Sequence, residues 1–412
     1  MFKEIIISTR SGRTRVAVIE DHVPVEVYFE PPGTELVGSV YKGKVENVLP
    51  GIEAAFINIG LERNAFLHVH DARALAESSK RVGIEELLQP GQEVVVQVIK
   101  GSFKSKGPRV TTQVTIPGRY LVLAPTVQHT GVSRRIGLPS ERERLRQLVA
   151  RLCPSGMGLI VRTAAEGVGE AELEHDLETL LKQWEEICAK AREPGPRLLF
   201  RDVELLPRIL RDFFTADVAR LVVDSPVLEA QVLKILDGME PGLKNRVVRE
   251  TGRNLMAVYG VEQEVKRALK RRVWLKCGGY LVFDQTEALT AIDVNTGKFV
   301  GSQNLEETVV KANIEAAYEI ARQLRLRNIG GIIIIDFIDM VEEKHRQKVL
   351  DALEEALKKD RVRFHILGIT KLGLVELTRK KTYPSLAEML LKSCPRCEGT
   401  GCVPVEKDDS LQ

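Results

Sequence analysis

Two apolar, strand-like segments that each end in a carboxylate, with a long amphipathic segment between them, constrain the fold of this chain most. The first, TAIDVN, contains Asp293 and Asn295, and the second, IIIIDFID, contains Asp336. Residues 305–327 have helical periodicity and are long enough for a crossover. A right-handed crossover makes the two strands parallel, so their carboxyl ends share one edge of a sheet. The four isoleucines before Asp336 predict a central strand that helices cover on both faces.

Two carboxylates at one sheet edge favour a bound cation, because the like charges otherwise repel each other. Oxygen ligands of this kind suit Mg²⁺, which one or two carboxylates usually hold. Asn295 lies two residues after Asp293 and so points to the same face, where it is expected to orient a ligand or a water. The alternative is that Asp336 only caps a turn.

A CxxC pair near the end of the sequence, Cys394 and Cys397 in CPRCEGTG, predicts a zinc site. Zinc takes four ligands, and neither a second CxxC nor a later histidine follows, although Cys402 is a candidate third ligand. Two chains that each donate one pair complete the site, which predicts a dimer. A redox role is the rival interpretation, but the strand-then-helix pattern of thioredoxin-type sites is missing around the pair.

Residues 36–116 contain short strand-like runs separated by glycine turns, which favour a small closed barrel such as an OB-fold. Phe56 and Phe66 are candidates for stacking on bases, and packing in the barrel core explains them equally well. The formal net charge is only +3, but basic residues are concentrated between Lys100 and Arg146. Such a local excess of positive charge is suited to binding along the phosphate backbone of a nucleic acid. The alternative is that these residues lie on the solvated face of a helix.

The length of 412 residues suggests about two to four domains. No apolar run approaches the roughly 18 residues of a membrane span, and the apolar stretch at the start is too short for a signal peptide. Six cysteines in so long a chain favour free thiols or metal ligands in a reducing compartment. We therefore expect a soluble, cytoplasmic protein.

Three motifs in the same order, EALTAIDVNTG, ARQLRLRNIGGIIIIDFIDM and CPRCEGTG, resemble those of the bacterial ribonuclease E/G family. The segment SVYKGKVENVLPGIEAAFINIG resembles the OB-fold RNA-binding domain of that family, and YLVLAP, GVSRRI and GMGLIVRTA resemble its 5′-sensor region. The resemblance covers nearly all of the chain. In layout, the chain is closest to the ribonuclease G branch, since no long polar C-terminal half follows.

The resemblance implies an α/β multidomain fold, in which an RNase H-like part is interrupted by an OB-fold and a 5′-sensor region. A DNase I-like α/β catalytic part and a zinc link follow. The implied parts are the first RNase H-like segment (1–35), the OB-fold RNA-binding domain (36–116), the 5′-sensor region (117–199), the second RNase H-like segment (200–275), the DNase I-like catalytic part (276–391), the zinc link (392–404) and a polar tail (405–412).

The resemblance also implies roles for individual residues. Asp293 and Asp336 match the magnesium ligands of the family, and Asn295 matches its accompanying catalytic asparagine. The RNA-contacting positions are matched by Phe56, Phe66 and Lys106. The 5′-monophosphate pocket is matched by Gly118, Val122, Arg162, Thr163 and Arg363. Cys394 and Cys397 match the zinc pair that two protomers share.

The function implied is a Mg²⁺-dependent endoribonuclease that cleaves single-stranded RNA, prefers 5′-monophosphorylated substrates and leaves 3′-hydroxyl and 5′-phosphate ends. Its expected roles are rRNA processing and mRNA decay, and its expected assembly is a homodimer held by shared Zn²⁺, with a higher oligomer left open. Two alternatives remain at this point: a DNA nuclease with the same metal chemistry, and an RNA-binding protein without catalysis.

Overall fold

The computed structural model describes residues 2–10, 12–30, 36–72, 82–101, 107–201, 205–297, 305–381, 383–392, 394–397, 399, 401 and 403. The chain forms two units, each built from separate segments of the sequence. The first unit comprises residues 1–30, 218–229 and 246–412, and the second comprises residues 31–217 and 230–245. The architecture is mixed α/β with several sheets.

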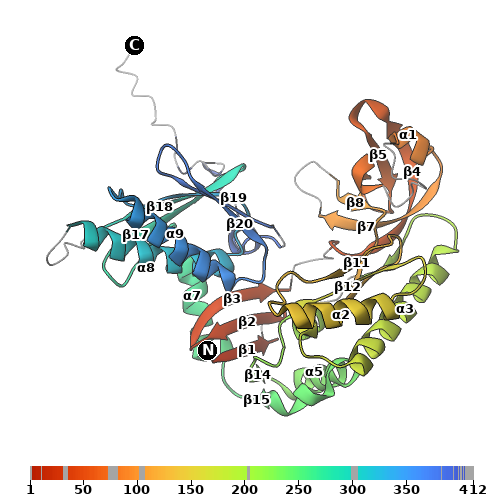
Figure 1. Ribbon diagram of the computed structural model, residues 1–412, viewed down its shortest axis with the longest axis horizontal. Helices are drawn as coiled ribbons and strands as arrows, with labels where there is room; N and C mark the ends of the chain where they lie inside the picture. Colours follow the sequence, from red (N-terminus) through yellow and green to blue (C-terminus); the bar gives the residue numbers. More distant parts are fainter. Residues whose placement is uncertain are drawn as a thin grey trace. The chain divides into compact units, whose positions relative to one another are not determined.

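One sheet of the first unit combines strands from the start of the chain with strands from residues 220–249 (Figure 1). Its order is β15 (Val247–Arg249), β14 (Arg220–Val223), β1 (Lys3–Ser8), β2 (Arg15–Glu20) and β3 (Val23–Phe29). β1 and β14 are parallel, with Ile5 opposite Leu221. Helices α6 (Leu255–Val258) and α7 (Val261–Ala268) pack against this sheet through an apolar cluster.

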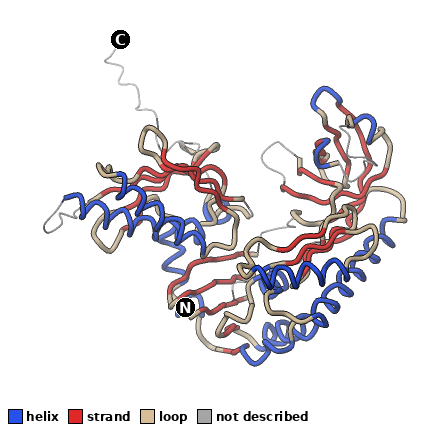
Figure 2. The backbone as a smooth tube through the Cα atoms, viewed as in Figure 1, coloured by secondary structure: helices blue, strands red, loops and turns tan. Residues whose placement is uncertain are grey.

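The other sheet of the first unit has six strands and is called here the catalytic sheet, because it carries Asp293 and Asp336, which the sequence predicts to be catalytic. Their order is β16 (Arg272–Trp274), β17 (Tyr280–Gln285), β18 (Leu289–Asn295), β19 (Gly331–Asp336), β21 (Val375–Arg379) and β20 (Phe364–Ile369). The crossover helix α8 (Leu305–Leu326) joins β18 to β19, and these two strands are parallel. Figure 2 shows α8 and the helix α9 (Glu343–Lys358) on the same side of this sheet.

The helices cover only one face of β19, so the prediction of a strand buried on both faces is wrong. Ile333 and Ile335 are fully buried in the core under α8 and α9. Ile332 is 51% exposed and Asp336 is also exposed on the opposite face. A run of isoleucines is compatible with two arrangements: a strand that helices cover on both faces, and a strand that exposes apolar side chains on one face.

A buried ion-pair cluster connects α8 to the five-stranded sheet of the first unit. The Arg325 guanidinium donates hydrogen bonds to Glu20 on β2 and to Glu26 on β3, at 2.7–3.0 Å. All three side chains are about nine-tenths buried or more. The paired charges offset the desolvation that each would suffer alone, and breaking the cluster leaves an uncompensated buried charge.

The second unit contains the expected five-stranded barrel, which confirms the OB-like fold predicted for this region. Its strands are β4 (Val40–Leu49), β5 (Ala54–Asn58), β6 (Ala65–His68), β8 (Arg109–Thr111) and β7 (Glu93–Lys100), and pairing of β7 with β4 closes the barrel. A further strand, β13 (Arg197–Phe200), extends the sheet along β4. The short helix α1 (Ile84–Leu87) adds Ile84 to the barrel core.

The second unit also contains a four-stranded sheet, and the helices α2 (Pro139–Leu152), α3 (Glu170–Ala191) and α4 (Leu205–Asp212) lie next to it in the sequence. The strand order is β11 (Thr130–Val132), β12 (Gly158–Val161), β10 (Leu121–Ala124) and β9 (Ile116–Pro117). Helices α2 and α3 bury leucines at three- and four-residue spacing in one core with this sheet. At the end of helix α4, Arg211 donates to the carbonyl of Pro117 on β9, and Asp212 accepts from Arg162, the residue that follows β12.

Candidate active site

Strands β18 and β19 bring Asp293 and Asp336 directly opposite each other at the carboxyl ends of two parallel strands. Neighbouring strands lie about 4.8 Å apart, so the two carboxylates share one small region of the sheet. Both side chains are exposed on the face that α8 and α9 leave uncovered. The Asn295 amide donates a hydrogen bond to the Asp293 carboxylate at 2.7 Å, which places all three predicted residues in one group.

The electrostatics of this group favour a cation. Burial, Asp293 and Asp339 together raise the pKa of Asp336 above its ordinary value. A carboxylate whose ionised form is disfavoured by neighbouring carboxylates gains most when a divalent cation lies between them. Two carboxylates and an amide form an oxygen-donor set that fits Mg²⁺, which usually retains several waters.

Asn313, on helix α8, holds the chain segment that follows Asp336. Its amide nitrogen donates to the carbonyl of Ile338 at 2.8 Å, and its amide oxygen accepts from the N–H of Ile338 at 3.1 Å. Asn313 is fully buried. It is therefore a positioning residue that the sequence analysis missed, and the signal for it was a single asparagine within the apolar face of a helix.

A second group of predicted residues surrounds the turn between β9 and β10, where Gly118 lies. The Asp176 carboxylate of α3 accepts hydrogen bonds from the backbone N–H groups of Arg119, Tyr120 and Leu121 at 2.9–3.0 Å. A Cβ atom on Gly118 would lie only 2.6 Å from the same carboxylate. This close approach accounts for glycine at the position, and Asp176 is a further residue that the sequence analysis missed.

Arg162 follows β12 and points to the same turn. One end of its guanidinium donates to the carbonyl of Gly118, and the other donates to the Asp212 carboxylate at 2.6 Å. Thr163 lies next in the chain and shares a hydrogen bond of 2.9 Å with the Ser133 hydroxyl. Val122 lies on β10, opposite Pro117 and Ile160. The structure thus brings Gly118, Val122, Arg162 and Thr163 into one region of the second unit.

The Asp212 side chain stays ionised beside these cations. Burial raises the pKa of Asp212, but hydrogen bonds and charge from Arg211 and Arg162 outweigh burial, so the pKa lies below its ordinary value. Arg211 also donates to the carbonyl of Pro117 at 3.0 Å. Asp212 therefore fixes one edge of the Arg162 guanidinium, whose side chain remains 26% exposed.

Arg363, the remaining residue predicted for this pocket, belongs to the first unit. It is exposed, and its Nε donates to Nε2 of His365 at 3.1 Å.

The two phenylalanines predicted to contact RNA lie opposite each other on β5 and β6 of the barrel. The ring centroids of Phe56 and Phe66 are 5.9 Å apart with an interplanar angle of 70°, an edge-to-face pair. Neither ring is fully buried, whereas their strand neighbours Ile57 and Leu67 are. The pair therefore lies on the outside of the barrel, and Lys106 lies outside the described residues.

The CxxC pair forms a turn in which backbone groups favour the thiolate. N–H groups of Gly401 and Gly399 lower the pKa of the Cys397 thiol, and Cys394 contributes in the same direction. Thiolates are the form that binds zinc, so the donors fit that metal. Cys394 is exposed, and Cys402 lies outside the described residues.

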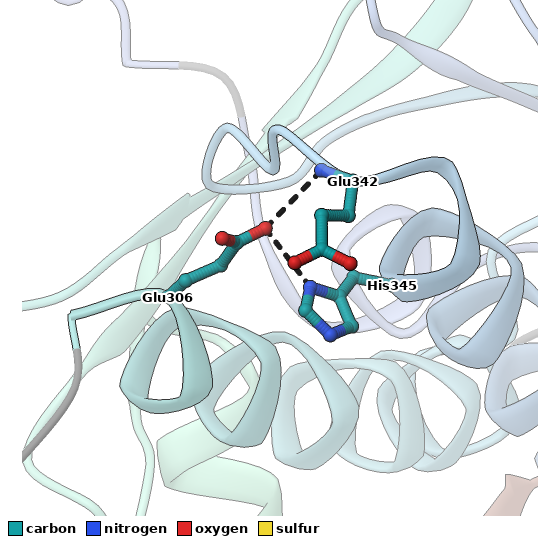
Figure 3. A group of neighbouring side chains, drawn as sticks. All are labelled: Glu306, Glu342 and His345. Carbon is teal, nitrogen blue, oxygen red and sulfur yellow. Dashed lines mark hydrogen bonds and ion pairs between the residues drawn. The ribbon is translucent and has the colours of Figure 1, made fainter.

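Glu306, Glu342 and His345 form another group of potential ligand atoms, all within 4.8 Å of one another (Figure 3). The Glu306 carboxylate already accepts the N–H of Glu342 at 3.1 Å and bonds Nδ1 of His345 at 2.9 Å. These bonds attach the start of α9 to the start of α8. The group therefore explains how the two helices are joined, and we assign no metal to it.

Across the described ranges, no helix combines the length and the apolar character that crossing a membrane requires.

Comparisons with known proteins agree with the resemblance of the motifs. The model of the "Ribonuclease E/G family" matches residues 115–382. Ribonuclease G of Escherichia coli K12 is 46% identical over 414 aligned positions, which cover 98% of this chain and 85% of that protein. Ribonuclease G of Haemophilus influenzae is 44% identical, with 97% and 84% covered. Ribonuclease E of a Nostoc strain is 44% identical over 97% of this chain and 59% of its own length.

Proposed function

The chain belongs to the ribonuclease E/G family, and from that premise we propose that it is a Mg²⁺-dependent endoribonuclease acting on single-stranded RNA with a preference for 5′-monophosphorylated ends. That it is an endoribonuclease of RNA processing and decay follows from the family. The metal, the strand preference and the 5′-end preference are our proposals. The observation that carries the metal-dependent cleavage is the opposition of Asp293 and Asp336 on the open face of the catalytic sheet.

In this mechanism, Asp293 and Asp336 would hold the metal, and Asn295 keeps the Asp293 carboxylate oriented through its hydrogen bond. A bound Mg²⁺ supplies positive charge for the scissile phosphate and lowers the pKa of a water nucleophile. Burial raises the pKa of Asp336, the charges of Asp293 and Asp339 add to that effect, and a cation held there would offset their repulsion. Asn313 fixes the backbone after Asp336, so the two carboxylates keep their spacing during the reaction.

Gly118, Val122, Arg162, Thr163 and Arg363 are proposed to recognise the 5′-monophosphate. The guanidinium of Arg162 and the hydroxyl of Thr163 suit a terminal phosphate, because charge-assisted and bidentate hydrogen bonds are the strong ones. Asp176 and Asp212 position this group through the contacts described above. Arg363 is included because it matches the family motif.

The edge-to-face pair of Phe56 and Phe66, with Lys106, is proposed to bind the RNA strand. Partly exposed aromatic rings on an OB-like barrel are typical platforms for base stacking. We also infer that the five-stranded sheet is the RNase H-like part and that the catalytic sheet with α8 and α9 is the DNase I-like part.

Cys394 and Cys397 are proposed to share one Zn²⁺ with the same pair of a second chain. The lowered pKa of Cys397 supports metal binding, and two thiolates supply only half of a tetrahedral site. The described cysteines are free thiols, and we place the enzyme in the cytoplasm, where thiols remain reduced.

A cleavage assay with matched single-stranded RNA and DNA oligonucleotides tests the proposed function. RNA cleavage that requires Mg²⁺ and stops with EDTA is the expected result. Equal cleavage of DNA favours the DNA nuclease, and RNA binding without cleavage at any Mg²⁺ concentration favours a binding protein.

A further inference from the structure

Two rows of residues run across the catalytic sheet from the proposed metal site to its edge. In one row, Asn295 on β18 lies opposite Tyr280 on β17, which lies opposite Trp274 on the edge strand β16. In the next row, Asp293 lies opposite Val282, which lies opposite Arg272. Directly opposed residues of paired strands project to the same face of a sheet.

Side-chain contacts support this shared face. The rings of Trp274 and Tyr280 have centroids 5.3 Å apart at an interplanar angle of 60°. The Arg272 guanidinium carbon lies 4.3 Å from the Tyr280 centroid and 5.9 Å from that of Trp274. We call Arg272, Trp274 and Tyr280 the aromatic platform. It lies on the open face of the sheet, on the same side as Asp293 and Asn295.

The aromatic platform is more exposed than aromatic side chains that serve only to stabilise the fold. Trp274 is 61% exposed, although tryptophan is normally well buried. It lies on a three-residue edge strand, where a large exposed apolar group favours unwanted association unless it has a function.

The charge near the platform is positive. Arg271 is neutralised by Asp284, at 2.5–2.6 Å. Lys270, Arg272 and Lys276 form no ion pair with any residue in the described part of the chain. Cations beside an exposed tryptophan match the requirements of single-stranded nucleic acid, which needs a stacking surface for a base and positive charge for its phosphates.

We propose that the aromatic platform is a subsite for RNA, in which a nucleobase beside the scissile phosphate stacks on Trp274 while Arg272 and the neighbouring lysines contact the backbone. This inference rests on the proposed metal site at Asp293 and Asp336. Two strand spacings, about 10 Å, separate Trp274 from Asn295. A strand whose phosphate lies at the carboxylates therefore passes the platform with its adjacent nucleotides.

Tryptophan fluorescence tests binding without any need for cleavage. The sequence contains two tryptophans, Trp184 and Trp274, so Trp184→Phe leaves Trp274 as the single emitter. The full-length variant is titrated with a single-stranded oligoribonucleotide in buffer without Mg²⁺ and without chelator, while a dye on the RNA reports total binding by anisotropy. We expect quenching of Trp274 emission that saturates together with the anisotropy. Unchanged emission at saturating RNA overturns the proposal.

Steady-state kinetics provide the second test, in protein that retains Trp184. Trp274→Ala is expected to raise KM roughly tenfold with little change in kcat, because a stacking contact with one base is lost before the chemical step. Trp274→Phe retains an aromatic ring and is expected to stay close to the parent. Equal KM values for the alanine variant and the parent contradict the subsite.

Different experimental outcomes would contradict the proposed metal site and the proposed aromatic platform. If Asp336→Asn still cleaves RNA, the metal site is wrong, whatever the fluorescence shows. If Asp336→Asn is inactive while Trp274→Ala has the KM of the parent, the metal site stands and the platform is excluded as a subsite.

Discussion

Asn313 and Ile338 exchange two hydrogen bonds, at 2.8 and 3.1 Å, between a helix side chain and the backbone that follows β19. The pair lies 25 residues apart in sequence and ties α8 to the segment that carries Asp336 and Asp339. Burial and the charges of Asp293 and Asp339 raise the pKa of Asp336, so the position of this segment affects the electrostatics of the proposed metal site.

Replacement of Asn313 is therefore expected to lower both stability and activity. Asn313→Leu keeps the approximate volume but leaves the N–H and C=O of Ile338 without their partner, at a cost of about 2–4 kcal/mol in the free energy of unfolding. Urea denaturation measures this loss, and cleavage at a temperature where the variant is folded measures activity. Lys311→Leu, on an exposed position of the same helix, is the control. Equal stabilities of the two variants contradict the positioning role.

Arg162 is expected to determine the response to the 5′ end of the substrate. Arg162→Ala removes the charge-assisted contact proposed for a terminal phosphate, so cleavage of 5′-monophosphorylated RNA is expected to slow about tenfold or more. Cleavage of the matched 5′-hydroxyl RNA is expected to change little. Rates measured on the two substrates decide the point, and equal slowing of both indicates a general RNA contact or a folding defect instead.

Asp176 is expected to maintain the turn at Gly118. Asp176→Ala leaves three backbone N–H groups without their acceptor and is expected to cost about 2–4 kcal/mol, with Asp176→Asn intermediate. Glu174→Ala, on the exposed side of the same helix, is the matched control. Denaturant midpoints of the three variants provide the comparison, and an Asp176→Ala midpoint equal to that of the control rejects the role.

The arrangement of the two carboxylate-ending strands, β18 and β19, was correctly predicted from the sequence. Two strands that end in carboxylates and are joined by one crossover helix have few possible arrangements, so the parallel pairing of β18 and β19 was predictable. The closed barrel was also predictable, because glycine turns separate its strands at short intervals.

The positioning residues were not predictable from sequence. Asp176 and Asn313 bond backbone groups far away in the chain, and no local pattern records such partners. Asp212 shows the same limit, because its partner Arg162 lies 50 residues away. The exposed face of β19 was missed because a continuous run of isoleucines lacks the alternation of apolar and polar residues that predicts an open face.

Zinc is expected to hold two chains together through Cys394 and Cys397. Two thiolates from each chain form a closed four-ligand site, so metal analysis is expected to find one zinc per two chains. Structural zinc contributes about 10–16 kcal/mol in small peptides, and chelation or Cys394→Ser is therefore expected to dissociate the dimer in light scattering. Cys188→Ser, which removes a free thiol from helix α3 outside the CxxC pair, is the control. One zinc per chain in a monomer rejects the shared site.

The most direct test of the account is single-turnover cleavage of a single-stranded oligoribonucleotide in Mg²⁺ by the parent, Asp293→Asn, Asp336→Asn and the exposed control Asp351→Asn. In the proposed mechanism the carboxylates act on the transition state more than on substrate binding, so each site variant is expected to lose on the order of 10³-fold in rate while it binds RNA nearly as well as the parent. The Asp351 control is expected to cleave at the parental rate. A rate within tenfold of the parent for either site variant contradicts the assignment of the metal site.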